Sequence, residues 1–538
     1  MSVSRILALL PFGVLFLLPL AAALAFMVPG LLDAAGFAAL LDHPQLGGAV
    51  FLTVFTGLLS TAVSTLLAFA IVAAAGGRDL ARRSAVFLAV PHLALAIGLA
   101  FVIMPSGMLA RLIAPLFAWI APPQWVTTQD PWGLSLTLAL ILKETPFLVW
   151  AIASLLNRDD MRRALEGQTS VARSLGHGPA STFLRVIAPQ ILPRLVGPLI
   201  AVLAYSLTVV DMAIVIGPGQ PPTLAQLVWT DLNDADPAMA ARGGAGVLVL
   251  SGLVLLVLFL VTALLPLLRP LRHALYTGAP RQDAAALGLL RAVWPLFFAI
   301  YAVVMIVMLV QSVAAQWPFP ALAPTQFTAA AWLRLVQEAA PFLTTLALAL
   351  ATSIVSLAAA VTWLEWASPQ ADSVAVFAAV LALCLPSLLL GLGQYRLFLA
   401  LGITGTATAL FIAHVVPVAA YVFLLLMGPY RAFDPRWQAV TASLSASRMR
   451  YFLRIKAPML RAPLLAATAT GFAVSVAQFV PAQLAAAGRY ATLPMEAVTL
   501  SSGGNRPLIA TYGLALMLLP LIVFLLAGWF GQPRWRQR

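Results

Sequence analysis

The 538-residue sequence has very few charged residues. Asp, Glu, Lys and Arg make up only 9% of the chain, whereas hydrophobic residues make up 62%. Because soluble domains carry about 25% charged residues, this deficit excludes an ordinary globular protein and predicts an integral membrane protein. Acidic residues are the scarcest, 18 against 31 Lys and Arg, which leaves a formal net charge of +13.

Cysteine is nearly absent as well. The single cysteine, Cys384, lies in an apolar run, so the sequence excludes a disulfide framework within the chain and a cysteine metal site. Its surroundings predict a small buried hydrophobe. The five histidines are scattered, and no cluster has metal-ligand spacing, so no metal site is expected.

Lysine occurs only twice, as Lys143 and Lys456. A phosphate-binding loop needs Gly-x-x-x-x-Gly-Lys-Ser/Thr, because backbone amides and a lysine must surround the phosphates. Neither lysine follows such a glycine pattern. We therefore expect the chain to bind no nucleotide cofactor and not to be an enzyme that hydrolyses ATP.

Long apolar runs dominate what the sequence does contain. Each needs about 20 residues to cross a bilayer, and helices are expected because every backbone polar group must be satisfied inside lipid. The alternating polarity of a membrane β-barrel is missing. The first run is interpreted as a retained span and not as a cleaved signal. Twelve candidate spans lie near 6–28, 48–75, 84–104, 133–156, 195–217, 244–268, 293–315, 340–365, 373–395, 403–428, 463–486 and 508–530.

The placement of the basic residues predicts the orientation. With the N-terminus inside, the inner segments hold 24 of the 31 Lys and Arg and the outer segments hold 6, while Lys143 lies within a span. This split fits the positive-inside rule. The basicity is therefore a membrane signature, no nucleic-acid partner is expected, and both termini are predicted to be cytoplasmic.

One basic stretch occurs twice. Loop 1 (residues 170–189) contains Ser-Val-Ala-Arg-Ser-Leu-Gly, then Phe-Leu-Arg, then Ala-Pro. Loop 2 (residues 439–458) contains Ala-Val-Thr-Ala-Ser-Leu-Ser, Phe-Leu-Arg and Ala-Pro, 269 positions later without a gap. Shared membrane composition does not readily produce such a match, so the sequence indicates a duplication. Further matches pair Thr53 with Thr344, Pro91 with Pro386, Gly98 with Gly393, and Thr223-Leu224 with Thr492-Leu493.

These observations predict an all-α polytopic membrane protein of about twelve helices. Each half carries six spans, and an even number of spans makes the halves parallel. The first half covers residues 1–268, with its core at about 48–268, and the second covers 292–538, with its core at about 340–530. The linker 269–291 contains Gly278 and Pro280, which interrupt regular structure.

Loop 1 resembles the EAA loop of ATP-binding-cassette (ABC) importer permeases. That pattern is Glu-Ala-Ala, a Gly four residues after the second Ala, and a Pro thirteen residues after the Gly. Ala172, Gly176 and Pro189 match, but Ser170 replaces the Glu. In such a loop Val171, Leu175 and Phe183 would supply an apolar side, and Gly176 would permit a turn with φ > 0. The residues expected to contact an ATPase are Ser170, Ala172, Arg173, Ser174, Leu175, Gly176 and Pro189.

Loop 2 matches the same pattern less completely. Pro458 is present, but Ala439 replaces the Glu and Ser445 replaces the Gly. Its expected contact residues are Ala439, Thr441, Ser443, Leu444, Ser445 and Pro458. The alternative for both loops is a solvated segment whose arginines only hold the topology.

The two-in-one arrangement is similar to the fused permeases of ferric-iron and thiamine importers. The stretches 475–479, 488–490 and 501–504 look most like the Ynj-type permeases of that group. This resemblance implies the type I importer transmembrane fold in both halves and a location in the bacterial inner membrane. It also implies a separate ATPase in two copies, an extracytoplasmic solute-binding protein, and a small hydrophilic solute.

Ionisable and polar groups inside spans are costly and mark functional candidates. The five candidates for a translocation path are Lys143, Glu144, Asp211, His414 and Gln478. The alternative is an interhelical lock, such as Lys143 with Asp211, since buried pairs are often structural.

Two other classes of function remain open at this point. An ion-coupled secondary transporter would use the intramembrane acids as a proton relay, but the second half lacks matching acids. A membrane enzyme would need a nucleophile–base or metal arrangement, and the sequence has no such motif.

Overall fold

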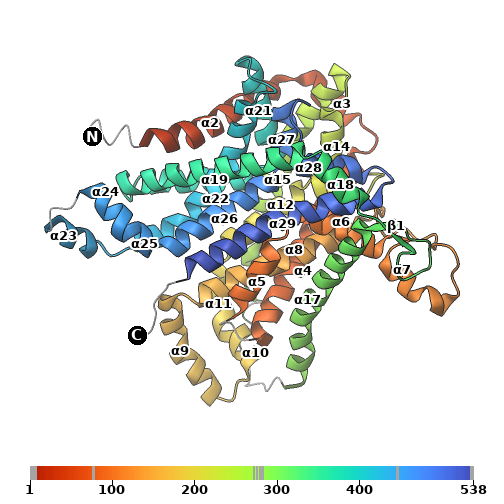
Figure 1. Cartoon of the computed structure of the whole chain (residues 1–538). Helices are drawn as coiled ribbons and strands as arrows, with labels where there is room; N and C mark the ends of the chain where they lie inside the picture. Colours follow the sequence, from red (N-terminus) through yellow and green to blue (C-terminus); the bar gives the residue numbers. More distant parts are fainter. Residues whose placement is uncertain are drawn as a thin grey trace. The chain divides into compact units, whose positions relative to one another are not determined.

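The computed structural model describes residues 9–75, 79–270, 273, 277, 284–443 and 447–532. Part of the predicted linker 269–291 and three residues of loop 2, Leu444, Ser445 and Ala446, lie outside these ranges. Helices account for nearly all regular structure (Figure 1). The prediction of an all-α polytopic protein is confirmed: nine described helices are long and apolar enough to cross a membrane, or up to twelve if each bent pair forms one span.

The described chain divides into two compact units. One unit contains residues 30–333 and 500–514, and the other contains 1–29, 334–499 and 515–538. These units differ from the two repeats in sequence, because each holds the first helix of the opposite repeat. We call them the 30–333 unit and the 334–499 unit.

The 30–333 unit is built around α4, which packs against α8 and α12. α5 packs against α8, and α17, the first helix of the second repeat, packs against α6 and α4. A short antiparallel pair joins Ala314 to Phe327. The elements are α3 (Ala34–Leu41), α4 (Leu46–Ala75), α5 (Leu80–Leu88), α6 (His92–Ile103), α7 (Met108–Ile113), η3 (Ala114–Phe117), α8 (Leu134–Leu156), α9 (Asp159–Ser174), α10 (Pro179–Thr182), η4 (Phe183–Ile187), α11 (Ala188–Ile191), η5 (Leu192–Arg194), α12 (Val196–Thr208), α13 (Asp211–Ile216), α14 (Leu224–Leu232), α15 (Pro237–Leu264), η6 (Leu265–Leu268), α17 (Ala284–Ser312), β1 (Ala314–Gln316) and β2 (Gln326–Phe327).

The 334–499 unit is built around α19, α22 and α26, which pack against one another. The first helix of the chain contributes to its core, where the Phe12 ring lies 5.2 Å from that of Trp363 and 5.1 Å from that of Phe423. The elements are η1 (Gly13–Leu17), α2 (Leu18–Ala25), α19 (Ala340–Trp366), α20 (Asp372–Cys384), α21 (Ser387–Ala400), α22 (Ala407–Arg431), α23 (Arg436–Ser443), α24 (Arg448–Tyr451), η7 (Phe452–Lys456), α25 (Ala457–Met459), α26 (Arg461–Val476) and α27 (Val480–Ala486). Four further elements cross the unit boundaries: η2 (Val28–Leu32), α18 (Ala330–Gln337), α28 (Leu493–Ser501) and α29 (Arg506–Gly531).

Several predicted spans are broken helices. The predicted span 84–104 consists of α5 and α6, separated at Pro91, which is extended at ψ 148°. Its counterpart Pro386 separates α20 from α21, which meet at 105°. Proline causes both breaks because it donates no backbone hydrogen bond and disfavours a helical residue before it. The predicted spans 195–217 and 463–486 are likewise interrupted, at 209–210 and 477–479.

The repeat is visible in hydrogen bonds. The Thr53 hydroxyl accepts a 2.8 Å bond from the Leu224 N–H, and the Thr345 hydroxyl accepts a 2.8 Å bond from the Leu493 N–H. The sequence comparison paired Thr53 with Thr344, and that pairing is wrong by one position. The structural counterpart is Thr345.

The segment before α8 is fixed by one carboxylate. Asp130 is buried and accepts hydrogen bonds from the N–H groups of Trp132, Leu134 and Ser135 and from the Ser135 hydroxyl, at 2.7 to 3.2 Å. Burial opposes ionisation, but these bonds, led by those of Ser135 and Leu134, outweigh it and lower the pKa of Asp130 below its usual value.

Candidate functional site

Loop 1 continues an amphipathic helix, α9, which has two acidic residues in its first turn. Asp159 and Asp160 suit the positive end of the helix dipole. The helix ends in a Schellman turn: the His177 N–H bonds to the Ala172 carbonyl at 3.1 Å and the Gly176 N–H to the Arg173 carbonyl at 3.0 Å. Gly176 has φ 88°, so the positive φ expected from the sequence is confirmed.

An open groove of about 590 Å³ lies between α9 and η4. Its lining is Ala164, Gly167, Gln168, Val171, Ala172, Leu175, His177 and Val186. Val171 and Leu175 are 58% and 63% exposed, so two large apolar side chains stand in solvent beside the Schellman turn. Exposed apolar surface next to a hollow marks a surface suited to a partner.

The remaining loop 1 residues differ in burial. Phe183 is buried and packs against Phe69 of α4, with ring centroids 6.0 Å apart, so it anchors the loop and does not line the groove. Ala172 is also buried, and Pro189 is half-buried. The others are exposed: Ser170, Arg173, Ser174 and Gly176.

Loop 2 repeats part of this geometry. Phe-Leu-Arg forms the start of a π-helical turn in both loops, η4 and η7, and each turn leads into a short helix at Ala-Pro. Ala439, Ser443 and Pro458 are exposed, whereas Thr441 is buried. Leu444 and Ser445 lie outside the described residues.

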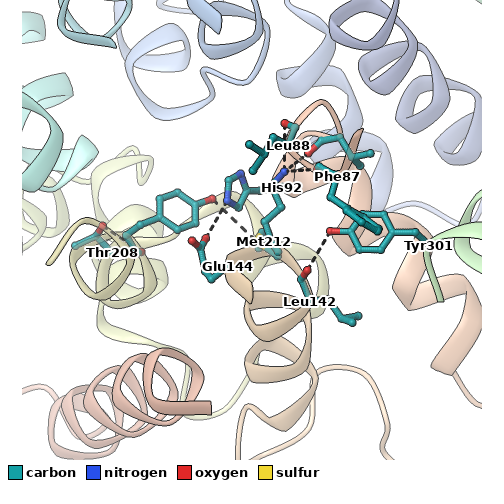
Figure 2. Close-up of polar contacts among 11 residues, drawn as sticks. Phe87, Leu88, His92, Leu142, Glu144, Thr208, Met212 and Tyr301 are labelled. Atoms are coloured by element: carbon teal, nitrogen blue, oxygen red, sulfur yellow. Dashed lines mark hydrogen bonds and ion pairs between the residues drawn. The ribbon is translucent and has the colours of Figure 1, made fainter. Parts of the chain in front are cut away.

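A buried polar cluster lies where α5, α6 and α8 meet (Figure 2). Lys143 is buried and donates to the carbonyls of Phe87 and Val90, at 3.0 and 2.5 Å. These carbonyls lie at and just beyond the end of α5, where no intrahelical partner exists. Lys143 therefore locks α5 to α8 through backbone atoms, and no bond from it to Asp211 is present among the described residues.

Pro146 gives rise to a second polar contact. It lies inside α8 and has no N–H for the carbonyl four residues earlier, that of Leu142. The hydroxyl of Tyr301 in α17 donates to this carbonyl at 3.1 Å (Figure 2). A helix from the second repeat thus satisfies a backbone group that Pro146 leaves free.

His92, which the sequence analysis missed, pairs with Glu144. Its Nε2 lies 3.1 Å from Glu144 Oε1, and the side chains are 28% and 7% exposed (Figure 2). Asp211 is half-buried at the first residue of α13, in electrostatic contact with His92. A polar residue directly after Pro91, inside an apolar run, was the signal that could have identified His92.

The candidates in the second repeat lie in the other unit. His414 is buried, and its Nδ1 lies 2.9 Å from the Ser475 hydroxyl, which lies 3.1 Å from that of Thr352. His414 Nε2 is buried and has no hydrogen-bond partner within the described part of the chain. Gln478 is half-buried in the break between α26 and α27. Among the described residues, no group of three or more His, Cys, Asp or Glu has the arrangement of a metal site.

The fold and the repeated loops define a class of protein: a polytopic helical membrane protein made of two related repeats. The chain is 30% identical to the inner membrane ABC transporter permease protein YnjC of Escherichia coli (strain K12), over 532 residues that cover 96% of this chain and 95% of that protein. It belongs to the ABC transporter permeases. No model of a known protein family matches the chain.

Proposed function

We propose that this chain is the permease subunit of an ATP-driven importer of the fused ferric-iron or thiamine type. In this proposal it forms the path for a small hydrophilic solute through the bacterial inner membrane, with both termini cytoplasmic. Two copies of a separate ATPase bind loops 1 and 2, and an extracytoplasmic binding protein delivers the solute. The chain itself binds no cofactor, and ATP is used by the partner.

The groove beside Gly176 is the observation that carries the proposal. Val171 and Leu175 present apolar surface that solvent does not favour, and the Schellman turn fixes the angle at which α9 meets the rest of loop 1. A surface helix of the ATPase that places apolar side chains into this groove would bury Val171 and Leu175. Arg173, which is exposed and follows the lining residue Ala172 in the sequence, supplies positive charge for an acidic counterpart.

The path is proposed to run past the helix breaks. In the 30–333 unit Glu144, His92 and Asp211 gather there, and in the 334–499 unit His414 and Gln478 hold the corresponding places. Broken helices bring backbone and side-chain polar groups to membrane depth, where they can line a hydrated path. Lys143 supports this region through its bonds to carbonyls.

The test is co-purification with the ATPase expected from a neighbouring gene. Leu175→Asp should abolish capture of the ATPase, since it places a charge in the groove. Leu116→Asp, at an 80% exposed residue of η3 outside the groove, is the matched control and should retain capture. Equal capture by both variants would show that the groove is not the docking surface. Uptake that continues without ATP would favour the secondary transporter instead.

A further inference from the structure

Glu365 lies in the last turn of α19 and contacts three side chains from other elements. It accepts hydrogen bonds from Lys456 Nζ at 2.5 Å and from the Tyr430 hydroxyl at 2.5 Å. Arg448 lies 3.4 Å away and also donates to the Glu365 backbone carbonyl. The Glu365 and Lys456 side chains are each only 13% exposed. Two of these partners, Arg448 and Lys456, belong to loop 2.

A second ion pair lies next to the first along the chain. Arg431, which follows Tyr430 at the end of α22, donates to both carboxylate oxygens of Asp372, at 2.7 and 2.9 Å. It also donates to the carbonyls of Leu364 and Ala367, at 2.9 and 3.2 Å. Asp372 in turn accepts from the Trp363 indole at 3.2 Å. The ends of α19 and α22 and the start of α20 are thus tied together.

Aromatic faces complete the network. The Arg448 guanidinium lies 4.0 Å from the centre of the Trp366 ring, and Lys456 Nζ lies 4.0 Å from that of Tyr430. Cations gain most from aromatic faces when both are shielded from water. Loop 2 is therefore held to α19 and α22 by charge, hydrogen bonds and cation–π contacts together.

The first repeat lacks the Glu365–Lys456 charges at the matching positions. The offset that pairs Thr53 with Thr345 pairs Glu365 with Ala73, and the loop offset pairs Lys456 with Ile187. An ion pair in the second repeat thus corresponds to two apolar residues in the first. Loop 1 is anchored instead by the Phe69–Phe183 contact.

We infer that Glu365 is a positioning residue that fixes loop 2 to the ends of α19 and α22, so that loop and helices move as one body when the ATPase acts. A shielded, multiply bonded carboxylate is suited to this role, because removing one partner from such a group is far more damaging than breaking an exposed pair. The movement by the ATPase rests on the proposed function, but the fixing of loop 2 does not.

The attachment of loop 2 to α19 and α22 is tested with the purified chain in lipid nanodiscs, without the ATPase. In a Cys384→Ser background, spin labels are placed at Met449→Cys and Val374→Cys, whose native side chains are 66% and 59% exposed. The distance distribution between the labels should be narrow, and Glu365→Gln should broaden it at least twofold. Glu338→Gln removes the acid of an exposed pair with Arg334 and is the matched control, expected to change nothing. A distribution as narrow in Glu365→Gln as in the control would overturn the inference.

Two additional variants distinguish loss of the ion pair from general misfolding. Lys456→Gln removes the same ion pair from the loop side and should broaden the distribution as Glu365→Gln does. The exchange Glu365→Lys with Lys456→Glu should recover part of the narrowness, which general destabilisation would not do. If the distance distribution were as broad in the exchange variant as in both single variants, the ion pair would not be what holds loop 2 in place.

The movement of loop 2 and the helices as one body is tested by adding the ATPase and a non-hydrolysable ATP analogue. With the native Glu365, the distance between the labels should stay constant, because loop 2 and α20 move together. In Glu365→Gln it should shift when the analogue binds. A shift with the native residue would refute movement as one body. If the ATPase does not bind at all, the proposed function fails, while the measurement on the chain alone still decides the fixing of loop 2.

Discussion

Gly393 lies directly against the backbone of Ala23. A Cβ atom on Gly393 would overlap the Ala23 carbonyl oxygen and carbonyl carbon. Gly98, the counterpart of Gly393, approaches α17 in the same way, with the Met308 sulfur 2.5 Å from the place of its missing Cβ. Each glycine thus admits the first helix of the opposite repeat.

We expect Gly393→Ala to lower thermal stability by about 1–3 kcal/mol, because the obstructing atoms belong to backbone and cannot rotate away. Gly98→Ala should cost less, because the obstructing atoms belong to the side chains of Val304 and Met308 and not to backbone. Gly428→Ala in α22, where nothing lies within 4 Å of the added atom, is the control and should be neutral or slightly stabilising. Melting curves of purified protein decide this, and an unchanged Gly393→Ala would contradict the close packing.

The paired threonine bonds give a second prediction. Thr53→Val and Thr345→Val should each destabilise the protein by about 1–3 kcal/mol, because each leaves a buried N–H, that of Leu224 or Leu493, without its acceptor. Thr362→Val is the control in α19, since the half-buried Thr362 hydroxyl donates to the carbonyls of Ala358 and Ala359 in its own helix. Thr344→Val should also leave the stability of the protein nearly unchanged. A larger loss at Thr344 than at Thr345 would refute the corrected pairing.

Asp130 predicts a dependence on pH. Its folded-state pKa lies below the unfolded value of about 3.9, so its stabilising contribution is complete above that value and is lost as the pH falls through the folded-state pKa. Asp130→Asn should therefore be less stable than the native protein at about pH 6, and the difference should shrink below about pH 4. Melting temperatures at both pH values test this. A difference that grows as the pH falls would have the wrong sign.

Asymmetry between the loops gives a fourth prediction. Valine at Gly176 would be strained by about 1–3 kcal/mol, since its φ of 88° disfavours β-branched residues. Gly176→Val should therefore detach or uncouple the ATPase, whereas Ser445→Val should do much less, because that position already carries a side chain. The measurements are ATPase capture from membranes and ATP hydrolysis by the complex. Equal losses of ATPase capture from both substitutions would show that the two loops do not differ in this way.

The fifth prediction concerns the path. Asp211→Asn should reduce solute uptake by cells while ATPase capture and thermal stability stay unchanged, because the carboxylate is half-buried beside His92 and its removal deletes no packing. Asp231→Asn is the contrasting variant: it breaks a buried pair with Arg242 at 2.7 Å and should lower stability. If Asp211→Asn loses stability as Asp231→Asn does, Asp211 is structural and the path assignment fails.

Local features of this chain were predictable, and long-range partners were not. The apolar runs predicted helices, and Gly176 predicted a positive φ, because both depend on nearby residues. The partner of Lys143 could not be predicted, since its acceptors are backbone carbonyls, which any residue supplies. Pro91 signals one helix break, but no proline marks the break before Asp211. The packing partners of α2 and α17 could not be predicted either, because a helix that is apolar on all sides does not indicate which other helix it contacts.

That placement has a consequence for biosynthesis. Ala23 and Gly393 lie 370 positions apart in the sequence, and ribosomes add about 5–20 residues per second. The first helix therefore spends roughly 20 to 70 s in the bilayer before α21 is synthesised. During that time lipid covers the face that later meets Gly393, so the helix must be stable in lipid alone, and the 334–499 unit completes its packing only when translation is nearly over.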